Sequence, residues 1–164
     1  MPRKKVKSEQ CHGSTVKHER CRKNTITDGK CWIHGDREEG LRVKPSTIPG
    51  AGKGLFATRP FDVGDKICSY KGKLMTKREV NKKWPGDEVA PYVLQITSSR
   101  FVDARKPTSC FGRFINHNER RANCLFESPT PKATATKSNV LATKRIKTGS
   151  ELFAEYGDGV QMCQ

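Results

Sequence analysis

Arg113-Phe114-Ile115-Asn116-His117-Asn118 is the most informative stretch of this sequence. It contains an adjacent Asn-His pair, which alone fits an ordinary turn because both side chains combine hydrogen-bond donors and acceptors. About sixty residues upstream lies a glycine-rich turn followed by a short apolar strand, Gly50-Ala51-Gly52-Lys53-Gly54-Leu55-Phe56-Ala57. About forty residues downstream lies Glu151-Leu152-Phe153-Ala154-Glu155-Tyr156-Gly157. These three separated segments have to be interpreted together.

Length and composition bound the class of protein. A chain of 164 residues, 34% of them apolar and nine of them proline, fits one domain with a modest core and a small appendage. No run approaches the ~20 apolar residues of a membrane helix, and no apolar stretch follows the basic N-terminus as in a signal peptide. We therefore expect a soluble, intracellular protein with no membrane partner.

The chain is strongly basic, with 32 Lys and Arg against 17 Asp and Glu and a formal net charge of +15. Such a field favours polyanions, so nucleic acid or a nucleosome is the expected contact of the basic surface. A basic protein with no nucleic-acid role is the alternative. The run Pro2-Arg3-Lys4-Lys5-Val6-Lys7 fits a nuclear-import signal or a nucleic-acid patch, and it fits a solvated, disordered terminus equally well.

Cysteine usage points to a metal in the N-terminal fifth of the chain. Seven cysteines without a secretion signal favour metal binding and buried thiols over a disulfide framework. Three of the seven fall within 21 residues, and the last is followed by a histidine after two intervening residues, as zinc ligands often are. The segment has too few large apolar side chains to fold by burial alone, so a metal would supply the missing free energy. The predicted zinc ligands are Cys11, Cys21, Cys31 and His34, with His12 and His18 as substitutes for one of them; three unrelated cysteines in a flexible arm are the alternative.

The remainder of the chain predicts a β-rich fold with short helices. Short runs of β-branched and aromatic residues are separated by turn residues, which is typical of many short strands. The expected strands are Leu41–Ser46, Leu55–Ala57, Lys66–Tyr70, Tyr92–Ile96, Arg100–Asp103 and Val140–Thr143. The best helix candidate is Met75–Trp84, which ends before Pro85-Gly86. We expect a basic disordered tail over residues 1–10, a Cys/His module with its linker over 11–40, the main domain over 41–157 and a C-terminal tail over 158–164.

Taken in order, these segments resemble the SET domain of S-adenosylmethionine-dependent protein lysine methyltransferases, over about Leu41 to Gly157. The turn Gly52-Lys53-Gly54 with Leu55-Phe56-Ala57 resembles the first cofactor motif of that family. Phe101-Val102-Asp103-Ala104, followed by Arg113-Phe114-Ile115-Asn116-His117, resembles its central motif. Gly149-Ser150-Glu151-Leu152, followed by Glu155-Tyr156-Gly157, resembles its closing motif. Each piece is weak alone, and the set in this order is a strong match to a minimal member of the family.

The resemblance implies a role for each matched position. The phenol of Tyr156 is expected at the transferring methyl group, although a tyrosine at a strand end can equally be a core residue. The cofactor-binding positions are expected to be Lys53, Gly54, Tyr92, Arg113, Asn116 and His117. Tyr70 is expected to line the channel for the target lysine, together with Ala154, whose small side chain leaves room for more than one methyl group.

The resemblance also implies a β-clip type of fold in which the segment Glu151–Gly157 threads beneath the loop that contains Asn116. Threaded loops are rare in proteins. The sequence departs from the family after His117, where Asn118 and Glu119 replace the usual Ser and Cys. We therefore expect no zinc-bearing cysteine tail, and closure of the lysine channel is left open between residues 160–164, the inserted helix and a second subunit.

The function implied is protein lysine N-methylation with S-adenosylmethionine as cofactor, a histone or another chromatin protein as the favoured substrate, and a structural zinc in the N-terminal module. The expected location is the nucleus, or a host nucleus if the source is viral, with the cytoplasm as second choice. Two alternatives remain: a non-catalytic chromatin or nucleic-acid binding module, and a methyltransferase of a non-histone protein. The sequence leaves the oligomeric state open, a dimer included.

Overall fold

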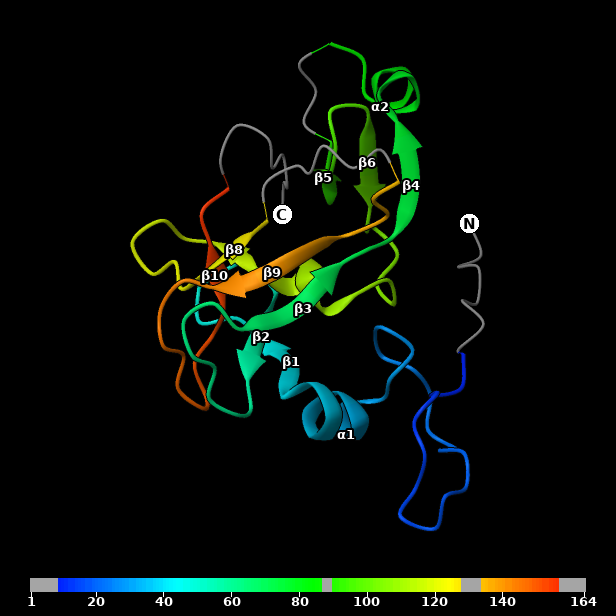
Figure 1. The fold of residues 1–164 in the computed structure, drawn as a ribbon, viewed down its shortest axis with the longest axis vertical. Coiled ribbons are helices and arrows are strands. Elements are labelled where there is room, and N and C mark those ends of the chain that lie inside the picture. The colour runs from blue at the N-terminus through cyan, green and yellow to red at the C-terminus, as the bar shows by residue number, and fades with distance from the viewer. Residues whose placement is uncertain (1–8, 87–89, 128–133, 157–164) are drawn as a thin grey trace.

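The computed structural model describes residues 9–86, 90–127 and 134–156. The chain is β-rich, with ten strands and a few short helices in the described ranges. Figure 1 shows three small sheets, with the N-terminal arm (residues 9–31) and the helix α1 (Trp32–His34) at one end and α2 (Lys77–Lys83) at the other. The expected terminal tails, residues 1–8 of the first and all of 158–164, lie outside the described residues.

The first sheet is a hairpin that carries the glycine-rich turn. Strand β1 (Leu41–Pro45) pairs antiparallel with β2 (Lys53–Ala57), with Leu41 opposite Ala57 and Pro45 opposite Lys53. Gly50 and Gly52 in the connecting loop have φ values of 80° and 68°, a region that favours glycine. Both strands agree with the sequence prediction to within two residues at either end.

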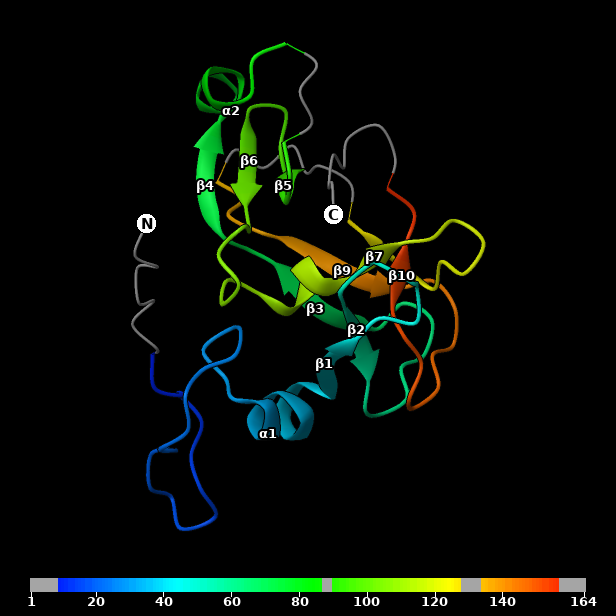
Figure 2. The ribbon, with the colours of Figure 1, turned by 180° about the vertical axis from the view of Figure 1, so that it is seen from behind.

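The second sheet contains five strands in the order β3-β9-β8-β10-β7. Strand β3 (Lys66–Tyr70) pairs antiparallel with β9 (Ser138–Ala142), and β9 pairs antiparallel with β8 (Cys124–Phe126). The remaining two strands are very short: β7 (Asn116–His117) and β10 (Phe153–Ala154). Figure 2 shows β10 beside β7 from the rear of the molecule.

Strand β10 is threaded through the loop that joins β7 to β8. It pairs in parallel with both, so Phe153 lies opposite Asn116 while Ala154 lies opposite both His117 and Cys124. The loop closes around it, because the Asn118 amide donates to the carbonyl of Ala154 at 3.1 Å. The Asn123 amide donates to the carbonyl of Phe153 at 3.0 Å. The expected threaded C-terminal segment is therefore present.

The third sheet has the order β4-β6-β5 and supports the inserted helix. Strand β6 (Arg100–Asp103) lies between β4 (Lys73–Thr76) and β5 (Val93–Gln95), antiparallel to both. Helix α2 begins two residues later than predicted, because Met75 and Thr76 pair with β6 instead. The Thr76 side chain and the Glu79 side chain cap each other's backbone amides, which fixes the start of the helix at Lys77.

Two apolar clusters form the core of the described domain. The larger cluster lies between the hairpin, the five-stranded sheet and a 3₁₀ turn, η2 (Phe111–Phe114). It includes Leu41, Leu55 and Leu152. The smaller lies against the three-stranded sheet and includes Tyr70 and Val102. Phe126 and Tyr156 pack against both clusters, so these aromatic rings lie where the two halves of the core meet.

The N-terminal arm has a different kind of interior. Its chain runs through isolated bridges and turns, and its buried cluster consists of Cys11, Cys21 and Cys31 with Ile33 packed alongside. A π-helical turn, η1 (Gly35–Glu39), follows α1 and leads into β1. No helix in the described ranges is both long and apolar enough to cross a bilayer.

Candidate active site

The Asn-His pair and the closing tyrosine meet in space at the end of the threaded strand. The backbone amide of Tyr156 donates to Nδ1 of His117 at 3.0 Å, and the two rings lie 5.2 Å apart. An accepting Nδ1 places the proton of a neutral His117 imidazole on Nε2. Two residues separated by 39 positions are thus joined by the parallel pairing of β10 with β7.

The Tyr156 phenol lies between the two parts of the core. Its hydroxyl donates to the carbonyl of Ile115, and its ring lies 6.2 Å from that of Phe126. Burial raises the pKa of Tyr156 well above its ordinary value, with smaller contributions from nearby Cys124 and Tyr92. The phenol is therefore neutral across the physiological range, and its oxygen keeps lone-pair capacity beyond the bond that it donates.

Tyr70 is fully buried and also packs against Phe126. Its ring meets that of Phe126 edge to face at 5.4 Å, and its hydroxyl donates to the carbonyl of Tyr92 at 2.8 Å. Burial raises the pKa of Tyr70 far above its ordinary value. Phe126 is not among the predicted site residues; the short apolar run Cys124-Leu125-Phe126 after the Asn-His loop is the sequence signal that indicates it.

The glycine turn and Asn116 are also brought together. The Asn116 side-chain amide lies 3.2 Å from the carbonyl of Lys53, at the start of β2. Atoms added as Cβ at Gly50 or Gly52 would meet nothing within 4 Å, so there is open space beside this loop. Backbone groups of the loop and the exposed His117 ring offer the mixed donors and acceptors that a nucleoside cofactor with an amino-acid end requires. The residues present therefore fit S-adenosylmethionine.

The other two predicted cofactor positions are connected differently. The Arg113 guanidinium stacks over the rings of Tyr92 and Phe114 at 4.4 and 4.7 Å. Its Nε donates to the carbonyl of Ala104 at 2.8 Å. These contacts attach Arg113 and Tyr92 to each other and to the end of β6, and their contact with a cofactor stays a prediction. Tyr92 has a φ of 58°, a strained value for a tyrosine.

Ala154 lies fully buried in β10, two residues before Tyr156. Ala154 belongs to the larger apolar cluster, and so does Cys124, which lies opposite it in the pairing of β10 with β8. A larger side chain at this position would have to displace packed neighbours. Its influence on the number of methyl groups stays a prediction.

The four predicted metal ligands form one cluster. Their ligand atoms all lie within 4.8 Å of one another, and all four side chains are buried. Nδ1 of His34 is 3.4 Å from Sγ of Cys11 and 3.3 Å from Sγ of Cys31, while the sulfurs of Cys21 and Cys31 are 4.0 Å apart. Zn–S bonds of ~2.3 Å and Zn–N bonds of ~2.0 Å in a tetrahedron put ligand atoms roughly 3.5–3.8 Å apart. The cluster therefore fits a tetrahedral metal ion.

Surrounding hydrogen bonds support the same assignment. Nε2 of His34 lies 2.8 Å from the carbonyl of Ser14, which fixes the proton on that nitrogen and turns a bare Nδ1 toward the sulfurs. The backbone amides of Gly13 and Cys31 point at Sγ of Cys11 at 3.4 and 3.2 Å. The substitutes considered from sequence, His12 and His18, are outside the cluster, and both are exposed.

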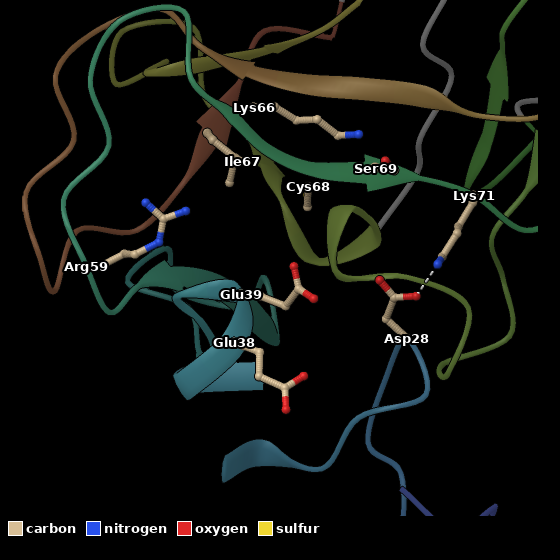
Figure 3. A pocket seen from close by; sticks show the side chains of 9 residues that line it. All are labelled: Asp28, Glu38, Glu39, Arg59, Lys66, Ile67, Cys68, Ser69 and Lys71. Carbon is tan, nitrogen blue, oxygen red and sulfur yellow. Dashed lines mark ion pairs between the residues drawn. The ribbon is translucent and has the colours of Figure 1, made fainter. Parts of the chain in front are cut away.

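A polar cavity of about 340 Å³ lies where the N-terminal arm meets the domain (Figure 3). Asp28, Glu38 and Glu39 face it from the arm and the π-helical turn, and an ion pair joins Asp28 to Lys71 beyond the end of β3. Lys30 pairs with both glutamates, at 2.8 Å to Glu38. None of the predicted catalytic or cofactor residues lines this cavity, so it marks the junction between arm and domain.

Comparisons with known proteins agree with this geometry. The model of the SET domain family matches residues 52–157. N-lysine methyltransferase KMT5A-A of Danio rerio is 32% identical over 130 residues, covering 74% of this chain and 36% of the relative. Histone-lysine N-methyltransferase Set8 of Drosophila melanogaster is 32% identical over 141 residues, covering 77% and 20%. The chain thus spans little more than a third of the first of these relatives and less of the second.

Solved structures show the same fold. A chain in the crystal structure of an active polycomb repressive complex 2 in the stimulated state superposes with a TM-score of 0.59 at 26% identity, covering 72% of this chain and 15% of that one. A chain of the Chaetomium thermophilum polycomb repressive complex 2 bound to GSK126 gives a TM-score of 0.61 at 24% identity, covering 73% and 16%. The similarity leaves about a quarter of the chain unmatched.

Proposed function

Because the chain belongs to the SET domain family, we propose that it is an S-adenosylmethionine-dependent protein lysine N-methyltransferase with Tyr156 at the methyl-transfer centre. The observation that carries this proposal is the parallel pairing of β10 with β7, which fixes Tyr156 beside His117. Two of the relatives that match this chain, over 130 and 141 residues, are named as lysine methyltransferases.

The bound cofactor supplies an electrophilic methyl group on a sulfonium, and the protein has to align, desolvate and stabilise charge around it. A neutral phenol suits that task, because its oxygen accepts weak C–H contacts without bringing a negative charge. A free lysine has a pKa of about 10.4, so the target amine must lose its proton before it attacks. Burial raises the pKa of both Tyr156 and Tyr70, so both phenols stay protonated at neutral pH and neither is available as a base. The proton is left to water.

The cofactor would lie against the glycine turn and the Asn-His pair. Backbone groups of Lys53 and Gly54 border its methionine end in this proposal, and Asn116 and His117 hold its ribose and adenine side. The space beside Gly50 and Gly52 and the short path from Asn116 to Lys53 support this arrangement. Arg113 and Tyr92 are assigned to the border of the same site. Tyr70 and Ala154 are assigned to the lysine channel.

The substrate we favour is a histone or another chromatin protein, in the nucleus. Set8 of Drosophila melanogaster is named as a histone-lysine methyltransferase, and this chain carries the positive charge that suits nucleosomal DNA. A basic enzyme would dock on the DNA and reach a basic tail locally. The basic run at Pro2–Lys7 lies outside the described residues.

We propose a structural zinc ion on Cys11, Cys21, Cys31 and His34. A closed set of four thiolate and imidazole ligands with no open position is typical of structural sites. The ion would fold the module of residues 11–40, while residues 41–157 form the catalytic domain. No step of methyl transfer involves this ion.

The test is incubation with labelled S-adenosylmethionine and, in parallel, histones, nucleosomes and a cell lysate. Transfer to nucleosomes supports the proposal in full, and transfer only to a non-histone protein retains the reaction but changes the substrate. Tyr156→Phe should lower the rate at least about a hundredfold while calorimetry shows cofactor binding retained. Absence of both transfer and cofactor binding in the wild type would favour the non-catalytic binding module instead.

A further inference from the structure

Glu151 carries a buried carboxylate that receives four hydrogen bonds from two distant segments. The residue as a whole is 5% exposed. Its Oε1 accepts from Ser46 Oγ at 2.6 Å and from the Asn116 amide at 3.3 Å. Its Oε2 accepts from the backbone amide and the hydroxyl of Thr47, at 2.8 and 2.5 Å. An ionised carboxylate offers about four lone-pair sites, so these bonds use its full capacity within the protein.

These bonds join both ends of the glycine-rich loop to the Asn-His strand. Ser46 and Thr47 lie where the loop leaves β1, and Lys53 lies where it enters β2. The Asn116 amide lies 3.1 Å from Ser46 Oγ and 3.2 Å from the carbonyl of Lys53, as well as close to the carboxylate. Glu151 therefore holds the entry of the loop directly and its exit through Asn116.

Gly54 leaves the room that this arrangement requires. A Cβ at that position would overlap Oε1 of Glu151. Gly54 is not among the residues with positive φ, so the need for glycine comes from space and not from backbone conformation. The two matched family motifs, one around Gly54 and one around Glu151, are thus complementary in shape at this contact.

The charge of the carboxylate is stabilised where it lies. Burial acts to raise the pKa of Glu151, but the hydrogen bonds from Ser46, Thr47 and Asn116 outweigh it, and the pKa is lowered below its ordinary value. At neutral pH the side chain is a buried anion with its bonds made, a costly group to disturb.

We propose that Glu151 is a positioning residue, which fixes the 46–53 loop and the Asn116 amide relative to each other so that the cofactor site is formed before the cofactor arrives. The inference rests on the proposed function for its effect on S-adenosylmethionine. Since all four acceptor sites are used internally, Glu151 acts through Asn116 and the loop and not by contact with the cofactor. Its loss should weaken cofactor binding and spare the methyl-transfer step.

Glu151→Gln is the first variant, because it keeps the shape and replaces one acceptor oxygen by a donor. Glu119→Gln is the matched control at an exposed position. We expect Glu151→Gln to weaken S-adenosylmethionine binding by about 10–100-fold in calorimetry, with kcat at saturating cofactor within about threefold of wild type. An unchanged dissociation constant, or a loss confined to kcat, overturns the proposal.

A rescue separates positioning from simple destabilisation. Gly54→Ala should weaken cofactor binding because its methyl group meets Oε1, and Glu151→Asp withdraws the carboxylate by one methylene. The double variant should therefore bind cofactor more tightly than Gly54→Ala alone, and strictly additive losses would contradict the shape argument. If Glu151→Gln does not fold, Ser46→Ala and Thr47→Val each remove part of the same set of bonds and should weaken cofactor binding in the same sense.

One readout needs no cofactor. The Thr47 amide, which donates to Glu151, should exchange its hydrogen at least about tenfold faster in Glu151→Gln, while the amides of β3 and β9 keep their rates. Unchanged exchange at Thr47 refutes the positioning role by itself. If the wild type fails to bind cofactor but the exchange result holds, the proposed function fails and the structural role of Glu151 stands.

Discussion

Substituting His34 by alanine should abolish binding of the proposed zinc ion at the N-terminal cluster, whereas substituting His12 or His18 should leave it bound. His34 directs Nδ1 at two of the three sulfurs and its other ring nitrogen at the carbonyl of Ser14. The other two histidines are exposed and outside the cluster. Because the three variants remove the same kind of side chain, metal content separates a ligand from a neighbouring histidine.

The size of the effect follows from how little else holds the arm together. Apart from Cys11, Cys21 and Cys31, residues 9–31 bury only Gly13 and Thr27. Ordering the backbone costs about 1–2 kcal/mol per residue, and three thiols bury too little apolar surface to offset that cost. A structural zinc contributes about 10–16 kcal/mol in small modules of this kind. Without the ion, the arm should unfold while the domain stays folded.

Hydrogen exchange measures this outcome at named amides. The amides of Cys11, His12 and Cys21 donate to the carbonyls of Lys23, Gly29 and Gly13 at 2.7–2.8 Å. In His34→Ala, or after chelation, their exchange should accelerate at least about a hundredfold, equivalent to about 2.8 kcal/mol. The reasoning is refuted if His34→Ala retains one equivalent of zinc, or if the metal-free protein keeps wild-type exchange at these amides.

Three further predictions concern the domain. Since the pKa of Glu151 is lowered in the folded state from its ordinary value of 4.5, its stabilising contribution is present above pH 4.5 and is lost as pH falls through the folded value; melting temperatures between pH 6 and 3 should fall less steeply in Glu151→Gln than in wild type. Burial raises the pKa of Cys124 to about 12, and that of buried Cys68 rises as well, so both thiols should resist iodoacetamide at pH 8 until the protein is unfolded, as read by mass spectrometry. Ala154→Phe should cost about 1–3 kcal/mol of stability through overpacking; it should also shift the product toward monomethyl-lysine, and an unchanged product distribution would contradict the assignment of Ala154 to the channel.

Sequence patterns were sufficient for strands with clear boundaries. Lys66–Tyr70 and Arg100–Asp103 are strands at the predicted limits, because turn residues or a glycine flank runs of β-branched and aromatic side chains. The start of the helix was predicted two residues early. A threonine three positions before a glutamate, Thr76 and Glu79, is a capping-box signal that places the start correctly.

The strands that build the candidate site could not be predicted from local pattern. β7 and β10 are two residues each, too short for any periodicity, and they exist because Asn116 pairs with Phe153 across 37 residues. The threading of the C-terminal segment was predicted from the resemblance to a known family, because no periodicity in the sequence indicates it. The partners of Glu151 are 104 and 105 residues away for Thr47 and Ser46, so nothing near Glu151 in sequence indicates its bonds.

The arm and the candidate site are nevertheless parts of one continuous path through the chain. His34 ends α1, the π-helical turn follows, and Gly40, with a φ of 70°, turns the chain into β1. Strand β1 ends next to Ser46, which donates to Glu151. However, Leu41 is fully buried in the main core and β1 is paired along its length with β2, so the domain fixes this strand without help from the metal. Two ion pairs, Asp28 with Lys71 and Glu9 with Lys106, join the arm to the domain. The arm is therefore built as a separable attachment, whose loss should leave the 46–53 loop and Asn116 in place.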